Sequence, residues 1–430
     1  MLRRSSSSQR YAFVVVAITF VALLVAAALR SAPGVLIRPL ELQFGWDRAT
    51  VSFAAAVGIF LYGLAGPFAA AAMQSLGVRK VMIGGLGLMA VASIASLWMT
   101  APWHYILSWG VVSGMGSGAI APVLGATIVN RWFAARRGLM MGLLTASTAT
   151  GALIFLPFMA WLTRNGAWAP VVLFVGIAAA ALIPLVWLLM PESPAAIGAS
   201  RYGESPGTLP ENLPDAGAMQ AIHVLVEAAR TPMFWLLFGT FFICGLTTNG
   251  LVGTHLIAYC GDNGIAPVAA AGLLSLMGLF DLFGTTASGW LTDRFDPRKL
   301  LFVYYGIRGL ALVALPALDF APAGLLIFAV LYGLDWIATV PPTVALANRY
   351  FGEARAPIVF GWVMTGHQIG AATAAIGAGL IREVTGSYFL AFLIAGMFGV
   401  LAAVMAVTIA RKAPLHGGGT TAQPALPLPR

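Results

Sequence analysis

Long apolar runs alternate with short polar connections along almost the entire chain. Six runs precede a polar stretch at 191–230, which is rich in Pro, Gly, Ser and acidic residues, and six follow it. The runs fall at 11–36, 50–73, 81–100, 103–129, 138–163, 168–190, 232–260, 266–291, 299–317, 321–346, 356–381 and 386–410. Because a helix needs about 20 apolar residues to cross a bilayer, the pattern predicts an all-α membrane protein with twelve transmembrane helices.

The composition strengthens this prediction. Of the 430 residues, 60% are hydrophobic and only 9% are charged, whereas a soluble protein is about a quarter charged. A lipid bilayer must therefore cover most of the surface. The net charge of +9 would also suit a nucleic-acid-binding protein, but the basic residues lie in short loops and form no soluble basic domain. We expect no nucleic-acid partner, no metal and no cofactor, because the sequence carries no motif for them.

The basic residues also predict the orientation of the chain. If the N-terminus is cytoplasmic, most of the 24 lysines and arginines fall on the cytoplasmic side, as the positive-inside rule requires. We expect a multi-pass protein of the inner (plasma) membrane with both termini in the cytoplasm. The first run, with Ala26-Ala27-Ala28 near its end, resembles a signal peptide, but it is long enough to span. Cys244 and Cys260 lie on one predicted helix, about 24 Å apart, so they cannot form a disulfide.

The chain also repeats itself. Asn130-Arg131-Trp132-Phe133 recurs as Asn348-Arg349-Tyr350-Phe351, at an offset of 218, and Gly77-Val78-Arg79-Lys80 corresponds to Asp296-Pro297-Arg298-Lys299, at an offset of 219. Each pair of matching segments occupies the same place in its half. The repeat predicts two six-helix bundles, at 1–190 and 231–412, joined by a cytoplasmic linker at 191–230. The Gly- and Pro-rich tail at 413–430 is predicted to be disordered and cytoplasmic.

One loop resembles a motif of a known family. Residues 289–299 read Gly-Trp-Leu-Thr-Asp-Arg-Phe-Asp-Pro-Arg-Lys, which is similar to the Gly-x-x-x-Asp-Arg-x-Gly-x-Arg-Arg/Lys loop of the major facilitator superfamily. Asp296 replaces a Gly of that motif, and the first-half copy has Gln74 and Ser75 in place of Asp-Arg. The resemblance implies a secondary transporter, not an enzyme, in which the two bundles rock around a central site.

The same resemblance implies a group of gating residues. Asp293 and basic residues near it would hold the two halves together on the cytoplasmic side. We include the basic residues of this loop and of the repeated segment: Arg294, Arg298, Arg131 and Arg349. The alternative is that the loop only anchors the protein at lipid headgroups.

The end of the first apolar run narrows the resemblance. Residues 33–40, Pro-Gly-Val-Leu-Ile-Arg-Pro-Leu, and 44–52, Phe-Gly-Trp-Asp-Arg-Ala-Thr-Val-Ser, resemble segments of monocarboxylate porters and oxalate–formate antiporters. The resemblance places Arg30 near a basic residue that contributes to substrate handling in animal monocarboxylate porters. It fails in the eighth span, where Asp281 matches an Asp of the family but Thr285 replaces the Arg that follows. The missing Arg argues against proton-coupled lactate or pyruvate transport, but the resemblance remains compatible with an organic anion as substrate.

Four ionisable residues of the second half are predicted at a common depth: Asp281, Arg308, Asp335 and His367. Each lies roughly 14–20 Å from the cytoplasmic end of its helix, and ionisable residues at that depth usually face a cavity or a partner. We predict a pair between Arg308 and Asp335. The pair would either fix helix packing or let Arg308 bind an anion directly or through Asp335.

The other candidates also keep two interpretations each. Asp281 could carry protons or contact substrate, since a low-dielectric site favours its neutral form, or it could pair with a cation. His367 could relay protons or contact an anion, or it could pack against a carbonyl group. Arg30 could extend toward the outer surface or line the outer mouth of a cavity. Tyr62 and Tyr332 could line that cavity, with helix packing as the alternative.

Two functions fit these residues. The first is a symporter or antiporter of small organic anions, with monocarboxylates favoured, driven by protons or by exchange. Arg30 and Arg308 would attract the anion, Asp281 or His367 would handle protons, and the protein would act as a monomer. The second is efflux of hydrophobic or drug-like compounds, with the buried charges structural. A membrane-embedded sensor or enzyme is disfavoured because the chain shows no soluble catalytic domain.

Overall fold

The computed structural model describes residues 2–46, 48–163, 165, 167–204, 217, 219–318 and 320–410. Within these ranges the protein is built from helices, and the one β-type pairing is an isolated bridge between Phe133 and Tyr202. Eleven helical stretches of the described chain are long and apolar enough to cross a membrane, and the longest, Pro322–Thr385, covers two predicted spans. The predicted all-α fold of twelve spans is confirmed. The tail predicted to be disordered lies outside the described residues.

The helices follow one another in two sets of six spans. The first half contains α1 (Leu2–Phe44), α2 (Arg48–Ser75), α3 (Val78–Ala95), a fourth span made of α4 (Pro102–Tyr105), η2 (Ile106–Val112), α5 (Ser113–Ala119) and α6 (Pro122–Trp132), then α7 (Arg137–Leu162) and α8 (Ala169–Leu189). The second half contains a span made of α10 (Pro232–Gly245), η4 (Leu246–Val252) and α11 (Gly253–Asp262), then α12 (Pro267–Thr292), α13 (Pro297–Ala314), α14 (Pro322–Asp335), α15 (Val340–Thr385) and α16 (Phe389–Thr408). Between them lie the short helices η3 (Pro194–Ile197) and α9 (Met219–Ala229).

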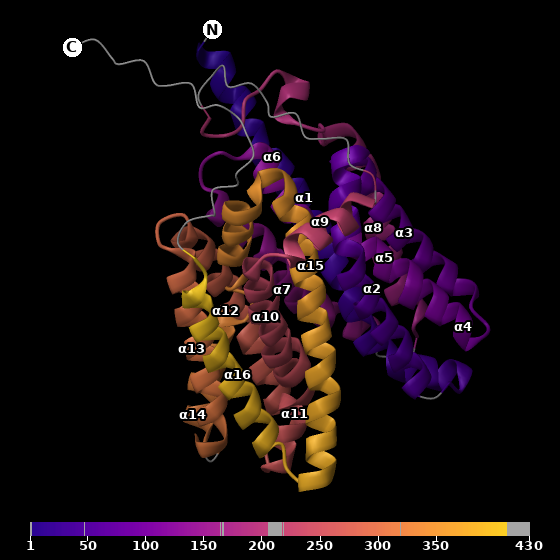
Figure 1. The fold of residues 1–430 in the computed structure, drawn as a ribbon. Helices are drawn as coiled ribbons and strands as arrows, with labels where there is room; N and C mark the ends of the chain where they lie inside the picture. Colours follow the sequence, from indigo (N-terminus) through magenta and orange to yellow (C-terminus); the bar gives the residue numbers. More distant parts are fainter. Residues whose placement is uncertain are drawn as a thin grey trace.

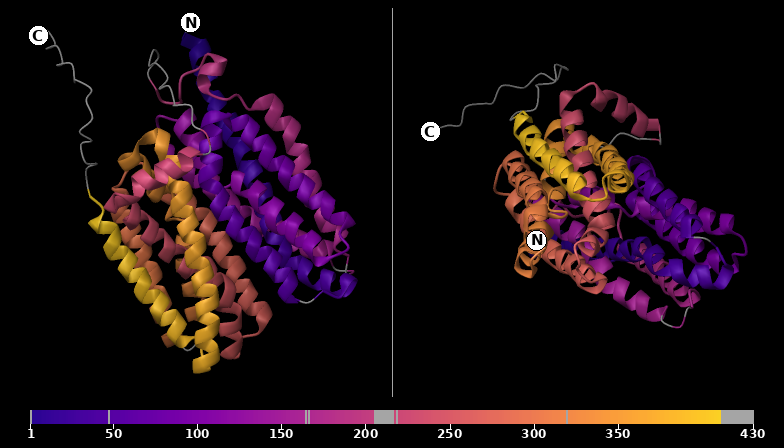
Figure 2. Two further views of the ribbon diagram at one scale, coloured as in Figure 1. Left: turned by 45° about the vertical axis from the view of Figure 1, so that its right-hand side comes forward. Right: turned by 90° about the horizontal axis from the view of Figure 1, so that it is seen from below.

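The two bundles lie side by side and diverge. Figure 1 and the left view of Figure 2 show them close together near the N-terminus and further apart toward the opposite end, and the right view of Figure 2 shows them side by side from below. We call the end at which α1 begins and α16 ends the termini end, and the opposite end the far end. The halves contact each other mainly along two helix pairs, α7 with α12 and α2 with α15.

Spans 4, 7 and 10 each contain an irregular turn. The fourth and seventh spans contain the π-helices η2 and η4, a geometry that often marks functional sites. The fourth span is also broken at Ile120 and Ala121, and the tenth at residues 336–339. The repeat offset of 218 relates the two breaks, because it carries positions 120 and 121 onto 338 and 339. A proline within the first residues after each break suits a helix start, where no intrahelical N–H bond is lost.

Glycines bring neighbouring helices of the first half into close contact. A Cβ atom on Gly114 or Gly118 of α5 would lie 2.8 Å from the carbonyl oxygen of Gly58 or Tyr62 of α2, respectively. Small residues allow such close helix contact in membranes. Helix packing therefore accounts for the glycine-rich fourth span.

Candidate functional site

Arg308 and Asp335 form the predicted pair in the core of the second half. The Arg308 Nε atom lies 2.7 Å from Asp335 Oδ2, and both side chains are almost fully buried. The guanidinium also donates to the Cys244 sulfur, 3.0 Å away, and to the carbonyl oxygens of Asp335 and Trp336. Because its donors are occupied and its side chain has no exposed surface, Arg308 contacts no solvent-borne anion in this conformation.

Asp281 lies beside this pair, and no cation among the described residues forms an ion pair with it. Its Oδ1 atom accepts hydrogen bonds from the Thr285 hydroxyl, at 2.6 Å, and from the Ile337 backbone N–H, at 2.9 Å. Its Oδ2 atom is buried and has no hydrogen-bond partner. Thr285, which stands where monocarboxylate porters carry Arg, thus acts as a neutral donor to the carboxylate. The described residues contain no cluster of His, Cys, Asp and Glu that could hold a metal ion.

His367 and Tyr332 lie near the same core but have other partners. The His367 Nε2 atom lies 3.4 Å from Asn249 Nδ2 on the π-helix η4, and its Nδ1 atom is buried without a hydrogen-bond partner. The Tyr332 hydroxyl donates to the Thr247 carbonyl oxygen, 2.7 Å away, and the side chain is fully buried. The structure therefore places His367 beside Asn249, an exposed polar residue of the seventh span, and Tyr332 inside the helix core.

Arg30 is the predicted substrate-binding cation of the first half. Its guanidinium carbon lies 4.5 Å from the ring centroid of Tyr62 on α2, within the range of a cation–π contact. Its Nε atom is buried and has no hydrogen-bond partner, and no carboxylate pairs with it among the described residues. The positive charge of Arg30 is therefore available to a ligand.

At the termini end, Asp293 forms hydrogen bonds between the two halves. Its carboxylate oxygens accept the backbone N–H groups of Gly138, at 2.7 Å, and Leu139, at 2.9 Å, in the first turn of α7. These N–H groups have no partner within their own helix, and a carboxylate there also interacts favourably with the helix dipole. One residue of the second half thus caps a helix of the first.

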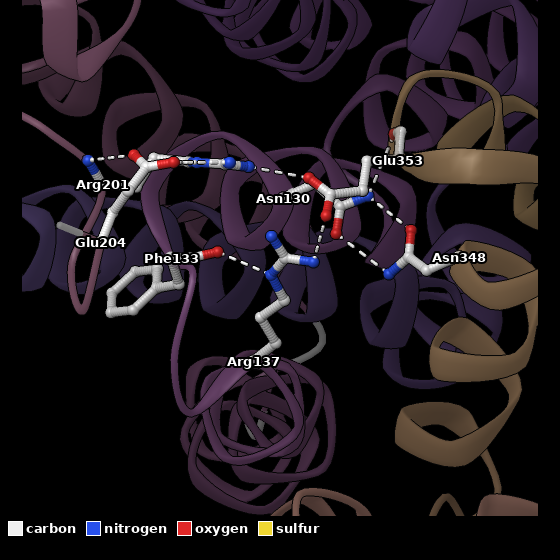
Figure 3. A network of polar contacts seen from close by, with 7 residues as sticks. All are labelled: Asn130, Phe133, Arg137, Arg201, Glu204, Asn348 and Glu353. Carbon is white, nitrogen blue, oxygen red and sulfur yellow. Dashed lines mark hydrogen bonds and ion pairs between the residues drawn. The ribbon is translucent and has the colours of Figure 1, made fainter. Parts of the chain in front are cut away.

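A second set of contacts, shown in Figure 3, surrounds the two repeated asparagines. Asn130 and Asn348 exchange side-chain hydrogen bonds of 2.7 and 3.0 Å across the halves. The Glu353 carboxylate of α15 forms two ion pairs. One is with Arg137 of α7, at 2.5 Å, and the other is with Arg201 of the connection after η3, at 2.7 Å. We call Asn130, Asn348, Arg137, Arg201 and Glu353 the gate network.

Further hydrogen bonds join α2 of the first half to α15 of the second half. Gln74 donates to the Ala354 carbonyl oxygen, and the Thr365 hydroxyl donates to that of Gly63, 3.0 Å away. At the far end, by contrast, the ion pair of Arg382 with Asp262 stays within one half. The described contacts therefore close the protein at its termini end.

The contacts of the remaining predicted gating arginines stay within their own half of the protein. Arg131 donates to the carbonyl oxygens of Met73 and Glu192, Arg294 lies over the Trp290 ring, and Arg349 is exposed. Arg298 pairs with Asp296 and donates to the Ile409 carbonyl oxygen. The same arginine holds the pKa of Asp296 below its usual range, and Asp296 also caps the start of α13. None of these contacts joins the two bundles.

Most residues of the gate network were not predicted from the sequence, although the sequence contains features that indicate some of its contacts. The two asparagines stand 218 residues apart, which is the repeat offset. Equivalent positions of two symmetric bundles can meet at the symmetry axis, so the repeated Asn was a candidate contact. Glu353 also had a signal, because it is the only acidic residue between positions 336 and 382. For Arg201, in the polar linker, no pattern indicated a partner.

Comparisons with known proteins agree with this architecture. The family model of the Major Facilitator Superfamily matches residues 18–375. Monocarboxylate transporter 13 of Rattus norvegicus is 29% identical over 402 residues, covering 92% of this chain and 88% of the relative. The gallate transporter of Pseudomonas putida is 23% identical over 378 residues, covering 79% of this chain and 81% of the relative.

The solved structures show the same fold. A crystal structure of the transporter FucP in the outward conformation superposes with a TM-score of 0.71 at 16% identity, covering 94% of this chain and all of FucP. At this identity the likeness concerns the fold alone. Together with the match over most of the chain, it leads to one conclusion: this protein is a member of the Major Facilitator Superfamily of membrane transporters.

Proposed function

We propose that the protein is a secondary active transporter of small organic anions, with monocarboxylates as the favoured substrates, that works by alternating access. The observation that carries the proposal is Arg30. It presents a positive charge, stacked on Tyr62, with a buried Nε atom that has no partner. Leaving a buried donor of a charged group without a partner is costly, and a carboxylate ligand would remove that cost. The names of the monocarboxylate and gallate transporters are consistent with such a substrate.

Asp281 supports proton coupling, with exchange as the alternative. The nearby cation, Arg308, is already paired with Asp335. An ionised Asp281 would therefore add an uncompensated negative charge to a dry core, which is unfavourable, and its free Oδ2 atom can hold a proton. Binding of a proton there would make the core neutral. His367, with its unpartnered Nδ1 atom, is a second candidate for proton transfer.

We also propose how the protein is oriented in the membrane and which conformational state the structure represents. We place both termini and the connection at 191–230 in the cytoplasm of a cell bounded by this inner (plasma) membrane, as the basic residues indicate. With that orientation, the contacts of Asp293 and of the gate network close the cytoplasmic side. The structure then corresponds to an outward-facing state of a transporter that works as a monomer.

Uptake into proteoliposomes tests the proposal. We expect labelled monocarboxylates to accumulate more than dicarboxylates or sugars, and a pH gradient to increase their accumulation if protons are the coupling ion. Accumulation that depends on a preloaded acid instead would indicate exchange. Failure of every acid to accumulate would overturn the proposal and favour efflux of hydrophobic compounds.

Arg30 provides the matched variants for this assay. We expect Arg30→Gln to reduce uptake at least about tenfold, since a charge-assisted hydrogen bond contributes roughly 1.5–3 kcal/mol. Arg30→Lys keeps the charge but not the planar fork, so we expect it to retain part of the activity with a raised KM. Equal uptake by the parent and Arg30→Gln would show that Arg30 does not contact the substrate.

A further inference from the structure

The break between α14 and α15, at residues 336–339, is held by side chains from two other helices. Arg308 of α13 donates to the carbonyl oxygens of Asp335 and of Trp336, the latter at 3.1 Å. From α12, Asp281 accepts the Ile337 N–H at 2.9 Å, and the Ser288 hydroxyl donates to the Ala338 carbonyl oxygen at 2.5 Å. Backbone groups that the break removes from the helix ladder thus gain partners elsewhere.

These bonds matter because the break lies inside the membrane. Backbone polar groups at membrane depth cannot turn to water, and each unsatisfied group is costly. Ser288 and Arg308 are both fully buried, so neither can be replaced by a water molecule without rearrangement. The angle between α14 and α15 therefore depends on where α12 and α13 place these two side chains.

The segment after the break leads to the gate network. The first part of α15 runs from Val340 to Phe351, and α15 is interrupted at Gly352, whose φ of 76° is not helical. Asn348 lies near the end of this segment, and Glu353 follows it directly. The twelve residues span about 18 Å, so a rotation of roughly ten degrees at the break moves the end by about 3 Å. A displacement of that size exceeds what the Glu353 ion pairs, at 2.5 and 2.7 Å, can tolerate.

We propose that residues 336–339 form the hinge of the gate network, and that Ser288, Arg308 and Asp281 are its positioning residues. The bond from Ile337 to Asp281 then links the hinge to protonation, a step that rests on the function proposed above. An ionised carboxylate is a stronger acceptor than a carboxylic acid, so protonation of Asp281 weakens its hold on Ile337. The charged and titratable groups that act on Asp281 from other helices are Arg308 and Cys244, together with Asp335.

Ser288 provides the test because it is not ionisable. Ser288→Ala removes the bond to Ala338, whereas Ser275→Ala, on the same helix, removes a hydroxyl that bonds only its own helix, at Ala271. Spin labels on Leu76→Cys and Phe295→Cys, both exposed connections at the termini end, one in each half, report the separation of the bundles. The native cysteines are buried, and the protein without introduced cysteines measures any background labelling.

We expect Ser288→Ala to shift the ratio of short to long distances toward the long ones by about fivefold, the effect of one lost hydrogen bond. Ser275→Ala should leave the ratio unchanged, and Ser288→Thr should restore it. Asp281→Asn, which carries a neutral acceptor, should match the parent at acidic pH and lose its response to pH. Melting curves of all variants in detergent separate a shift in conformation from a loss of fold.

Two outcomes would overturn the inference, and each differs from failure of the transport proposal. Equal distance ratios for Ser288→Ala and Ser275→Ala would show that the break does not control the gate network. A pH response that survives in Asp281→Asn would disconnect the hinge from this carboxylate. Neither measurement needs a substrate, so both remain decisive even if no organic acid is transported.

Discussion

The breaks in the fourth and tenth spans occupy equivalent positions but are stabilised differently. In the fourth span, the hydrogen bonds at the break join backbone groups to each other. The Ile120 N–H donates to the Ser117 carbonyl oxygen, at 3.0 Å, and the Leu124 N–H donates to the Ala121 carbonyl oxygen, at 2.9 Å. In the tenth span, side chains of α12 and α13 bond the backbone at 335–338. A broken helix at this position therefore needs no buried charge.

The residues that make the difference have no counterparts in the first half. Neither repeat offset, 218 or 219, places a charged residue opposite the charges around the tenth-span break. At 218, the residues that correspond to Asp281, Ser288 and Arg308 are Gly63, Ala70 and Ala90. Because buried charges are costly, and the fold forms without them in one half, those of the second half point to a role in function or conformational control.

The largest effect is expected from substitutions in the Arg308–Asp335 pair, which distinguish a structural role of the pair from a role in transport. Arg308→Ala leaves a buried carboxylate without its partner, which costs about 3–5 kcal/mol. We expect a strongly lowered melting temperature in detergent and loss of transport. The double change Arg308→Ala with Asp335→Ala should recover most of the stability. If the double variant also recovers transport, the pair is structural; a stable double variant without transport identifies a functional pair.

A glycine on α12 tests how closely the halves must approach. A Cβ atom on Gly289 would meet the Gly138 carbonyl oxygen and lie 2.9 Å from the Gly142 Cα atom, whereas Gly278 on the same helix has nothing within 4 Å. We expect Gly289→Ala to shift spin-label distances at the termini end toward the open state by at least about tenfold, since overpacking costs roughly 1–3 kcal/mol. Gly278→Ala should leave them unchanged, and an effect of equal size there would contradict the steric explanation.

Substitution of two glutamates compares an ion pair between the halves with an ion pair on the surface. Glu353 binds arginines of α7 and of the linker, while Glu227 on α9 pairs with Arg355 at 2.6 Å, with both side chains more than half exposed. We expect Glu353→Gln to destabilise the closed termini end by about 1 kcal/mol and Glu227→Gln by less than about 0.5 kcal/mol, as exposed ion pairs contribute little. Spin-label distances measure both, and equal shifts would remove the special role of Glu353.

The smallest expected effect is a dependence on acid. Hydrogen bonds from Arg201 hold the pKa of Glu204 below its usual range. A carboxylate with a lowered folded-state pKa stabilises the protein above its unfolded-state value, and this contribution is lost as the pH falls through the folded-state pKa. We expect the melting temperature to fall once the pH drops below the ordinary pKa of a glutamate, and Glu204→Gln to reduce that fall. An unchanged acid response in Glu204→Gln would assign it to other carboxylates.

Much of the architecture was predictable because it depends on local properties. The length of an apolar run specifies a span, and a repeat at a constant offset predicts two similar bundles whatever their packing. Depth along a helix follows from residue counts, so Arg308 and Asp335 could be paired from the sequence. For Asp293, a resemblance in its loop predicted a gating role, and the structure adds its hydrogen bonds to the start of α7.

The contacts across the halves were less predictable because they depend on lateral position. Arg131 and Arg137 lie six residues apart near the same end of the first half, yet Arg137 reaches Glu353 while Arg131 bonds carbonyl groups of its own side. Which of the two arginines contacts the other half depends on the rotation of each helix about its axis and on the angle between the bundles. Residue counts give depth but neither of these quantities, so the partners of long charged side chains followed from the packed arrangement of the helices.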